Sequence, residues 1–104
     1  MPFDDIIYNI NTPSRVSRLR KEIEKLRRIG GVRSAELRRL ARQVGRKPHP
    51  RGKEPTWVNE RFPRARPLSI PGHRELNRFT TRAILDRLEE DLDLILAEME
   101  EREE

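Results

Sequence analysis

Proline is unevenly distributed along this chain of 104 residues, and its distribution limits what the middle of the chain can form. Six of the eight prolines lie in residues 46–73, which also contain the only tryptophan, Trp57. Proline has no amide hydrogen and clashes with the preceding helical turn, so this segment cannot form a long helix. Its apolar residues alternate in "TWVNERF" and "RPLSIP", which predicts short strands joined by turns. Because Pro48, Pro50 and Pro55 cannot donate to a ladder, the first strand is expected to be an edge strand or irregular.

Two helices are predicted before this segment. The first begins at Pro13, is stopped by Gly30, and carries an apolar stripe at steps of three and four residues: Val16, Leu19, Ile23 and Leu26. The second runs from about Ser34, a good N-cap residue, to Val44, and Gly45 ends it.

A third, long helix is predicted after the proline-rich segment, capped by Thr80 or Thr81. Its apolar stripe continues almost to the end of the sequence: Ile84, Leu85, Leu88, Leu92, Ile95, Leu96 and Met99. The final residues, "EEREE", are expected to fray. The predicted order is therefore helix, helix, strands and helix, which is an α+β arrangement.

Charge divides the chain into a basic body and an acidic end. Residues 1–85 contain 21 Lys and Arg against 8 Asp and Glu, residues 86–104 contain 2 against 10, and the whole chain carries +5. A basic surface on a small domain favours a polyanionic partner, because neutralising phosphates releases counterions. The alternative is that the basic first helix and the acidic last helix neutralise each other. We favour nucleic acid, because most of the basic excess lies outside any one helix.

The first and last helices are complementary to each other. The first has 7 basic against 2 acidic residues between Arg15 and Arg28, the last is acidic, and both have apolar stripes. They are expected to pack together within one chain, and a homodimer through the same stripes is the alternative. A further hypothesis is that the acidic helix covers the basic face and masks it from RNA.

The composition excludes several kinds of site. Without cysteine there can be no disulfide or thiolate metal site, and with two histidines neither a metal site nor another cofactor is predicted. No apolar run approaches the roughly 20 residues that a membrane helix needs, and the first ten residues are acidic where a signal peptide is basic. A cytoplasmic protein without a membrane partner is therefore expected. Because the core of one small domain has no room for a deep cavity, the site should lie at the surface.

The segment from about Ser34 to Leu88 resembles the HicA family, the small mRNA-cleaving toxins of bacterial toxin–antitoxin systems. The resemblance lies in "SAELRRLARQVG", in a basic stretch ending in "RG", and in "LSIPGHRELNRFTTRAIL". It implies a fold like that of double-stranded-RNA-binding domains, with a three-stranded antiparallel sheet packed on helices, and a HicB-like antitoxin as partner. The HicA-like domain would span residues 32–92. An N-terminal arm with the basic helix (1–31) would precede it, and an acidic extension of the last helix (93–104) would follow.

The catalytic histidine of that family is missing here. The resemblance places it in a "GSH" triplet at the start of the second strand, where this chain has Gly52, Lys53 and Glu54. Histidine suits RNA cleavage because its pKa of about 6.5 lets it take a proton from the 2′-OH or donate one to the leaving oxygen. An ordinary glutamate, with a pKa of about 4.3, accepts a proton only weakly at neutral pH and cannot donate one.

Three interpretations of "RGKEPTW" stay open. In the first, Glu54 is a general base and a neighbouring arginine or lysine stabilises the transition state. In the second, His49 or His73 supplies the acid–base chemistry. In the third, the motif is a structural turn in which Glu54 pairs with an arginine and Trp57 packs on the sheet.

The predicted function is that of a HicA-like toxin that binds mRNA, and that cleaves it without metal if Glu54 or a histidine supplies the acid–base chemistry. The alternative is a non-catalytic RNA-binding or protein-interaction module. The candidate catalytic residues are Glu54 and His73. The candidate RNA-binding residues are basic side chains around the strands and at the start of the last helix: Arg46, Lys47, Arg51, Lys53, Arg74, Arg78 and Arg82.

Overall fold

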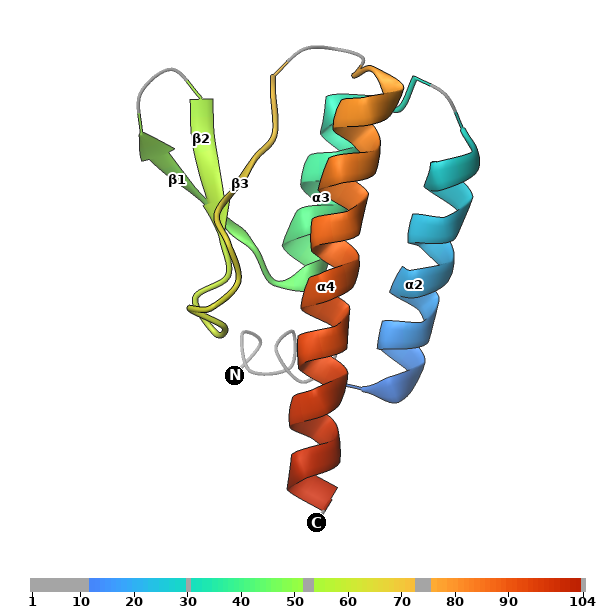
Figure 1. The fold of residues 1–104 in the computed structure, drawn as a ribbon, viewed down its shortest axis with the longest axis vertical. Coiled ribbons are helices and arrows are strands. Elements are labelled where there is room, and N and C mark those ends of the chain that lie inside the picture. Colours follow the sequence, from blue (N-terminus) through green and yellow to red (C-terminus); the bar gives the residue numbers. More distant parts are fainter. Residues whose placement is uncertain (1–11, 30, 52–53, 73–75, 104) are drawn as a thin grey trace.

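The computed structural model describes residues 12–29, 31–51, 54–72 and 76–103 (Figure 1). With the labels of Figure 1, the helices of this part are α2 (Pro13–Arg28), α3 (Ser34–Val44) and α4 (Arg78–Glu103). The strands are β1 (Lys47–Arg51), β2 (Glu54–Val58) and β3 (Leu68–Ser69). The order of elements confirms the predicted α+β class. Among the described residues, no helix combines the length and the apolar character needed to cross a membrane.

Local contacts fix the ends of α2 and α3. The side-chain oxygen of Thr12 accepts a hydrogen bond from the Arg15 amide at 3.2 Å. Pro13 occupies the first turn of α2, where a missing amide hydrogen costs nothing. α3 ends at Gly45, whose φ of 110° lies in the left-handed region that glycine adopts without strain, and whose amide donates to two carbonyls of the last turn. Both helices thus have the predicted boundaries.

Two predicted helix caps are wrong. Ser34 does not cap α3, because Arg33 holds the cap position without a side-chain hydrogen bond. The Ser34 hydroxyl instead donates to the carbonyl oxygen of Pro71 at 2.5 Å, which ties the start of α3 to the segment before α4. α4 begins before Thr80, since the side-chain oxygen of Asn77 accepts a hydrogen bond from the Thr80 amide at 2.8 Å.

The sheet has the order β1-β2-β3, and both strand pairs are antiparallel. β1 pairs with β2 along its whole length, from Lys47 to Arg51. β3 is shorter and pairs only with Thr56 and Trp57. β1 is therefore the edge strand that its prolines predict, and Pro55 lies beyond the part of β2 that β3 contacts.

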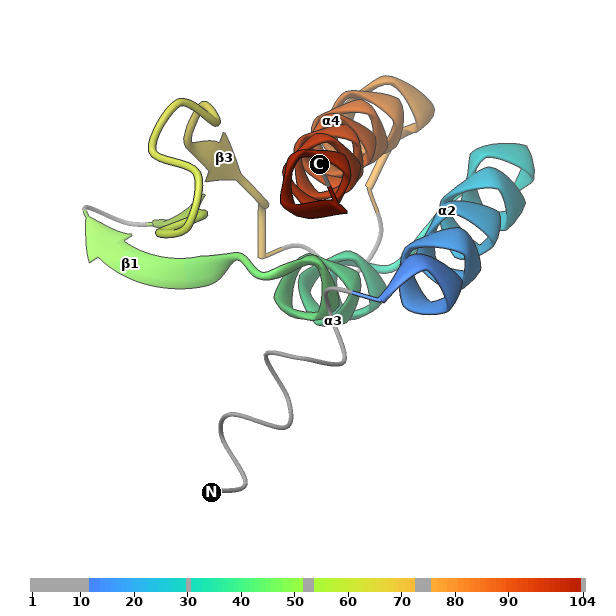
Figure 2. The same cartoon turned by 90° about the horizontal axis from the view of Figure 1, so that it is seen from below.

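α4 lies at the centre of the fold, where α2, α3 and β3 all contact it (Figures 1 and 2). It continues through Glu103, beyond the point where fraying was expected. The apolar stripes of α2 and α4 are buried in one core and face each other inside a single chain. This packing confirms the expected intramolecular arrangement, in which the two stripes cover each other within one chain.

Candidate nucleic-acid interface

The sheet has a buried face and an exposed face. Trp57 and Leu68 are opposite each other on β2 and β3, and they are 1% and 6% exposed. The next cross-strand row consists of His49, Thr56 and Ser69. Successive strand residues alternate between faces, so this row lies on the side turned away from the core. His49 and Ser69 are exposed and Thr56 is half-buried, so this outer face is open to a ligand.

A histidine, a lysine and a glutamate meet on the outer face. His49 Nε2 lies 3.5 Å from Glu60 Oε1, and Lys47 Nζ lies 3.8 Å from Glu60 Oε2. The side chains of His49, Lys47 and Glu60 are 52%, 69% and 59% exposed, so all three are accessible. Glu60 lies just after β2, and the pairing of β1 with β2 brings it beside the start of β1. A carboxylate beside an imidazole can orient the ring for proton transfer.

Glu54 is the first residue of β2, and the register pairs it with Arg51. Residues two apart in a strand share a face, so position 54 belongs to the same side of the sheet as Thr56. The side chains of Glu54 and Arg51 lie outside the described part, and the roles predicted for both stay predictions. Three further predicted site residues also fall outside the described residues: Lys53, His73 and Arg74.

Arg46 was predicted to bind RNA, and the structure corrects this prediction. Arg46 is only 2% exposed, and its guanidinium is held inside the chain by four hydrogen bonds. Nε and Nη2 donate to the Asp91 carboxylate at 2.7 and 3.0 Å, and Nη1 donates to the carbonyl oxygens of Trp57 and Arg66 at 2.8 and 2.9 Å. A guanidinium this buried cannot reach a phosphate. Arg46 instead joins the end of α3 to β2, to the loop after β2, and to α4.

Trp57 is a core residue. It is 1% exposed, and the Arg42 guanidinium lies over its ring, 5.1 Å from the ring centroid. This distance is typical of a cation–π contact. The structure therefore confirms that Trp57 has a packing role, as the third interpretation of "RGKEPTW" predicted.

The first turns of α4 present a second group of exposed side chains. Arg78 and Arg82, both predicted RNA-binding residues, are exposed, and Phe79 between them is 84% exposed. We did not predict Phe79 from the sequence. The signal was available, because Phe79 lies opposite the apolar stripe of α4 on a helical projection. An open aromatic ring beside arginines can stack on a base while the arginines contact phosphates.

Comparisons with known proteins found no match, so a proposal about function has to rest on the fold and on these surfaces. No protein-family model, curated protein or solved structure matches this chain. Within the ranges that the structure describes, no three His, Asp or Glu side chains are grouped so that they could hold a metal ion.

Proposed function

We propose that this chain is a HicA-like toxin that binds mRNA on the outer face of its sheet and cleaves it by acid–base chemistry. The observation that carries the proposal is the contact between His49 and Glu60 on the exposed side of an edge strand. Position 54, where the resembled family has its histidine, lies on the adjacent strand. Because His49 pairs with Thr56, positions 49 and 54 are diagonal neighbours, roughly 7–8 Å apart in an antiparallel pair. A histidine at position 49 can therefore serve the same phosphate as one at position 54.

In this proposal His49 is the general base that removes the proton of a 2′-OH. The 2′ oxygen then attacks the adjacent phosphorus, and the bond from phosphorus to the 5′ oxygen breaks. The products are a 2′,3′-cyclic phosphate and, once the leaving oxygen has taken up a proton, a 5′-OH end. Glu60 orients the His49 ring, and Lys47 offsets the negative charge that develops on the phosphate oxygens.

We expect both proposed partners, RNA and an antitoxin, to bind the outer sheet face. RNA would extend from the outer sheet face, and the exposed group of Arg78, Phe79 and Arg82 offers it a further contact. The resemblance implies a HicB-like antitoxin, which would inhibit the toxin by covering the outer sheet face.

Incubation of labelled mRNA in the presence of a chelator tests the proposal. We expect the wild type to cleave, and His49→Gln to lose roughly 100-fold or more of the rate, because positioned acid–base groups contribute about that much. His73→Gln tests the competing assignment, since it changes the other histidine of the chain, and in this proposal it should keep the wild-type rate. Glu60→Gln should lower the rate without abolishing it, because the imidazole remains.

RNA binding is measured separately by gel shift for each variant, after circular dichroism has shown that it is folded. A wild type that shifts RNA without cleaving it would establish the non-catalytic RNA-binding module instead. If cleavage survives His49→Gln but not Glu54→Gln or His73→Gln, the chemistry belongs to the residue predicted from the sequence. A wild type that neither binds nor cleaves RNA would refute both functions.

A further inference from the structure

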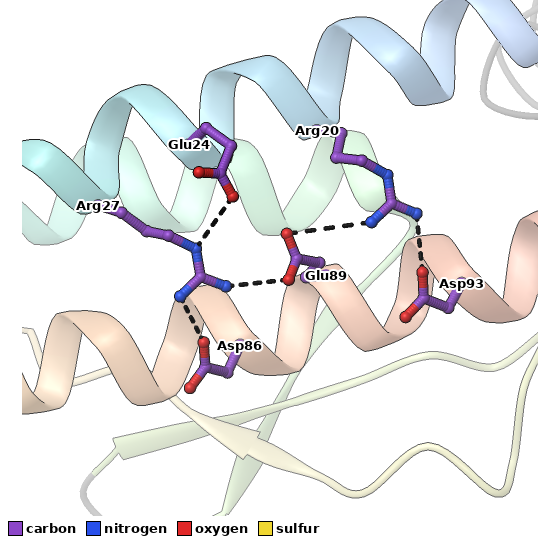
Figure 3. A network of polar contacts seen from close by, with 6 residues as sticks. All are labelled: Arg20, Glu24, Arg27, Asp86, Glu89 and Asp93. Atoms are coloured by element: carbon purple, nitrogen blue, oxygen red, sulfur yellow. Dashed lines mark hydrogen bonds and ion pairs between the residues drawn. The ribbon is translucent and has the colours of Figure 1, made fainter.

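Two of the seven basic side chains of α2, those of Arg20 and Arg27, face α4 (Figure 3). Arg27 Nη1 lies 2.6 Å from Asp86 Oδ1, and its Nη2 lies 3.1 Å from Glu89 Oε1. Arg20 Nη2 lies 2.7 Å from Asp93 Oδ1. Burial lowers the pKa of the Arg27 guanidinium, but the hydrogen bond to Asp86 and the nearby carboxylate charges outweigh burial and hold the pKa above its ordinary value. These two arginines are therefore occupied by the contact between α2 and α4.

Four other cations form a stripe on the opposite side of α2. This outer stripe consists of Arg18, Lys21, Lys25 and Arg28, and all four residues are exposed. Each follows a buried residue of the apolar stripe by two positions, which is a rotation of about 200° around the helix. Within the described chain, none of the four forms an ion pair. The sequence left open that the acidic last helix neutralises the basic first helix. In the structure the carboxylates of α4 pair with Arg20 and Arg27, and the outer stripe keeps its charge.

The outer stripe is also long and hollowed. Its first and last members, Arg18 and Arg28, are ten residues apart, so the stripe extends for about 15 Å along the helix axis. Lys21, Lys25 and Arg28 line an open hollow of about 690 Å³, which Ser17, Arg20, Glu24 and the half-exposed Ile29 also line. A row of cations of this length can contact several successive charges of an extended polyanion.

The chemistry of α2 favours a nucleic acid over a lipid surface. Helices that lie on membranes insert an apolar face between the headgroups. In α2 that face is used in the core, because Val16, Leu19, Ile23 and Leu26 are buried at 5% exposure or less. The exposed surface of α2 is polar and mostly basic. Such a surface suits contacts to a phosphate backbone, which do not involve the base edges.

We propose that the outer stripe of α2 is a second RNA-binding surface, which holds the phosphate backbone independently of the outer sheet face. This inference rests on the proposed function, because it takes RNA as the ligand. The stripe would supply affinity that does not depend on sequence, while the sheet face supplies the chemistry. Its contribution should fall with salt concentration, since each phosphate contact releases counterions.

The test is the salt dependence of RNA binding by the full chain, measured by fluorescence anisotropy with a labelled single-stranded RNA. The stripe variant is Lys21→Gln with Lys25→Gln. The control is Arg64→Gln with Arg66→Gln, which changes the net charge equally at two exposed residues of the loop before β3. Those two arginines line a groove together with the acidic side chains Asp86, Glu90 and Asp93 of α4, where a phosphate would meet carboxylates.

We expect the stripe variant to bind about 25-fold more weakly than the wild type at 0.1 M salt. The slope of log K against log salt should become shallower by about 1.4, because two contacts to a single strand are lost. The control should keep the wild-type slope. A stripe variant that binds like the wild type would overturn the inference while leaving the proposed function intact, and so would an equal loss in the control. A wild type that binds no RNA would overturn both.

Discussion

Replacing Asp91 by leucine would leave the Arg46 guanidinium buried and charged without its carboxylate. Both side chains are 1% exposed, so water cannot take the place of the lost partner. Removing one member of a buried ion pair costs about 3–5 kcal/mol. A domain of this size has a free energy of unfolding of about 5–15 kcal/mol, so Asp91→Leu should remove a large part of it. Arg46→Met should cost at least as much, because it strands the carboxylate and also removes the donor from the carbonyl oxygens of Trp57 and Arg66.

The double variant distinguishes the cost of a stranded charge from the cost of lost contacts. With Arg46→Met and Asp91→Leu together, no charge is left behind. The remaining defect is that the carbonyl oxygens of Trp57 and Arg66 lose their donor, while Asn59 Nδ2 loses only a long contact of 3.5 Å to Asp91. Each unsatisfied group costs about 1–3 kcal/mol. The double variant should therefore lose about 2–6 kcal/mol, against about 6–10 for the sum of the single losses.

Urea unfolding followed by circular dichroism measures these free energies, and an unchanged m-value shows that the unfolding transition is comparable among variants. The control is Arg61→Met, which removes an arginine whose salt bridge to Glu98 is partly exposed. It should cost about 1 kcal/mol or less. A double variant that loses as much as the two single variants added together would refute the reasoning, because it would show that the charges of Arg46 and Asp91 do not stabilise each other.

Three further predictions concern stability and use the same measurement. Ile23→Ala should cost about 2–4 kcal/mol, because Ile23 is fully buried between the helices; a loss below 1 kcal/mol would contradict the packing of α2 on α4. Gly45→Ala should cost about 1–2 kcal/mol through its left-handed backbone alone, since the nearest atom to an added Cβ is the Asn59 Nδ2 at 3.9 Å; a neutral result would contradict that backbone conformation. Arg27→Gln should cost about 1 kcal/mol at low salt and less at high salt. Because the pKa of Arg27 is raised in the folded state, its contribution should be constant from neutral pH upward and be lost only in strong alkali; a loss of its effect near neutral pH would refute this assignment.

The helices were predictable because their signals are local. Apolar residues at steps of three and four mark α2 and α3, and Pro13 and Gly45 mark their ends. The caps were harder to predict. The hydroxyl of Ser34 bonds to Pro71, 37 residues further along the chain, and no local pattern shows such a partner. The start of α4 was placed too late because Asn77 lies outside the apolar stripe that guided the prediction.

The site was only partly predictable for a related reason. Sequence shows how many cations a segment contains, but it does not show which of them find a buried partner. Arg46 belongs to the basic run "GRK" and was counted with its neighbours, yet its partner Asp91 lies 45 residues away. Glu60 was missed as a neighbour of His49 because the strand register, which sequence does not fix, brings the two together.

The position of α2 on α4 also sets an order of events during synthesis. Arg20 and Arg27 contact carboxylates that lie 73 and 59 residues further along the chain. At about 5–20 residues per second, a ribosome needs several seconds to make that stretch. Throughout that time the apolar stripe of α2 has no α4 to cover it. α2 therefore cannot pack on α4, and Arg20 and Arg27 cannot form their ion pairs, until α4 has been synthesised.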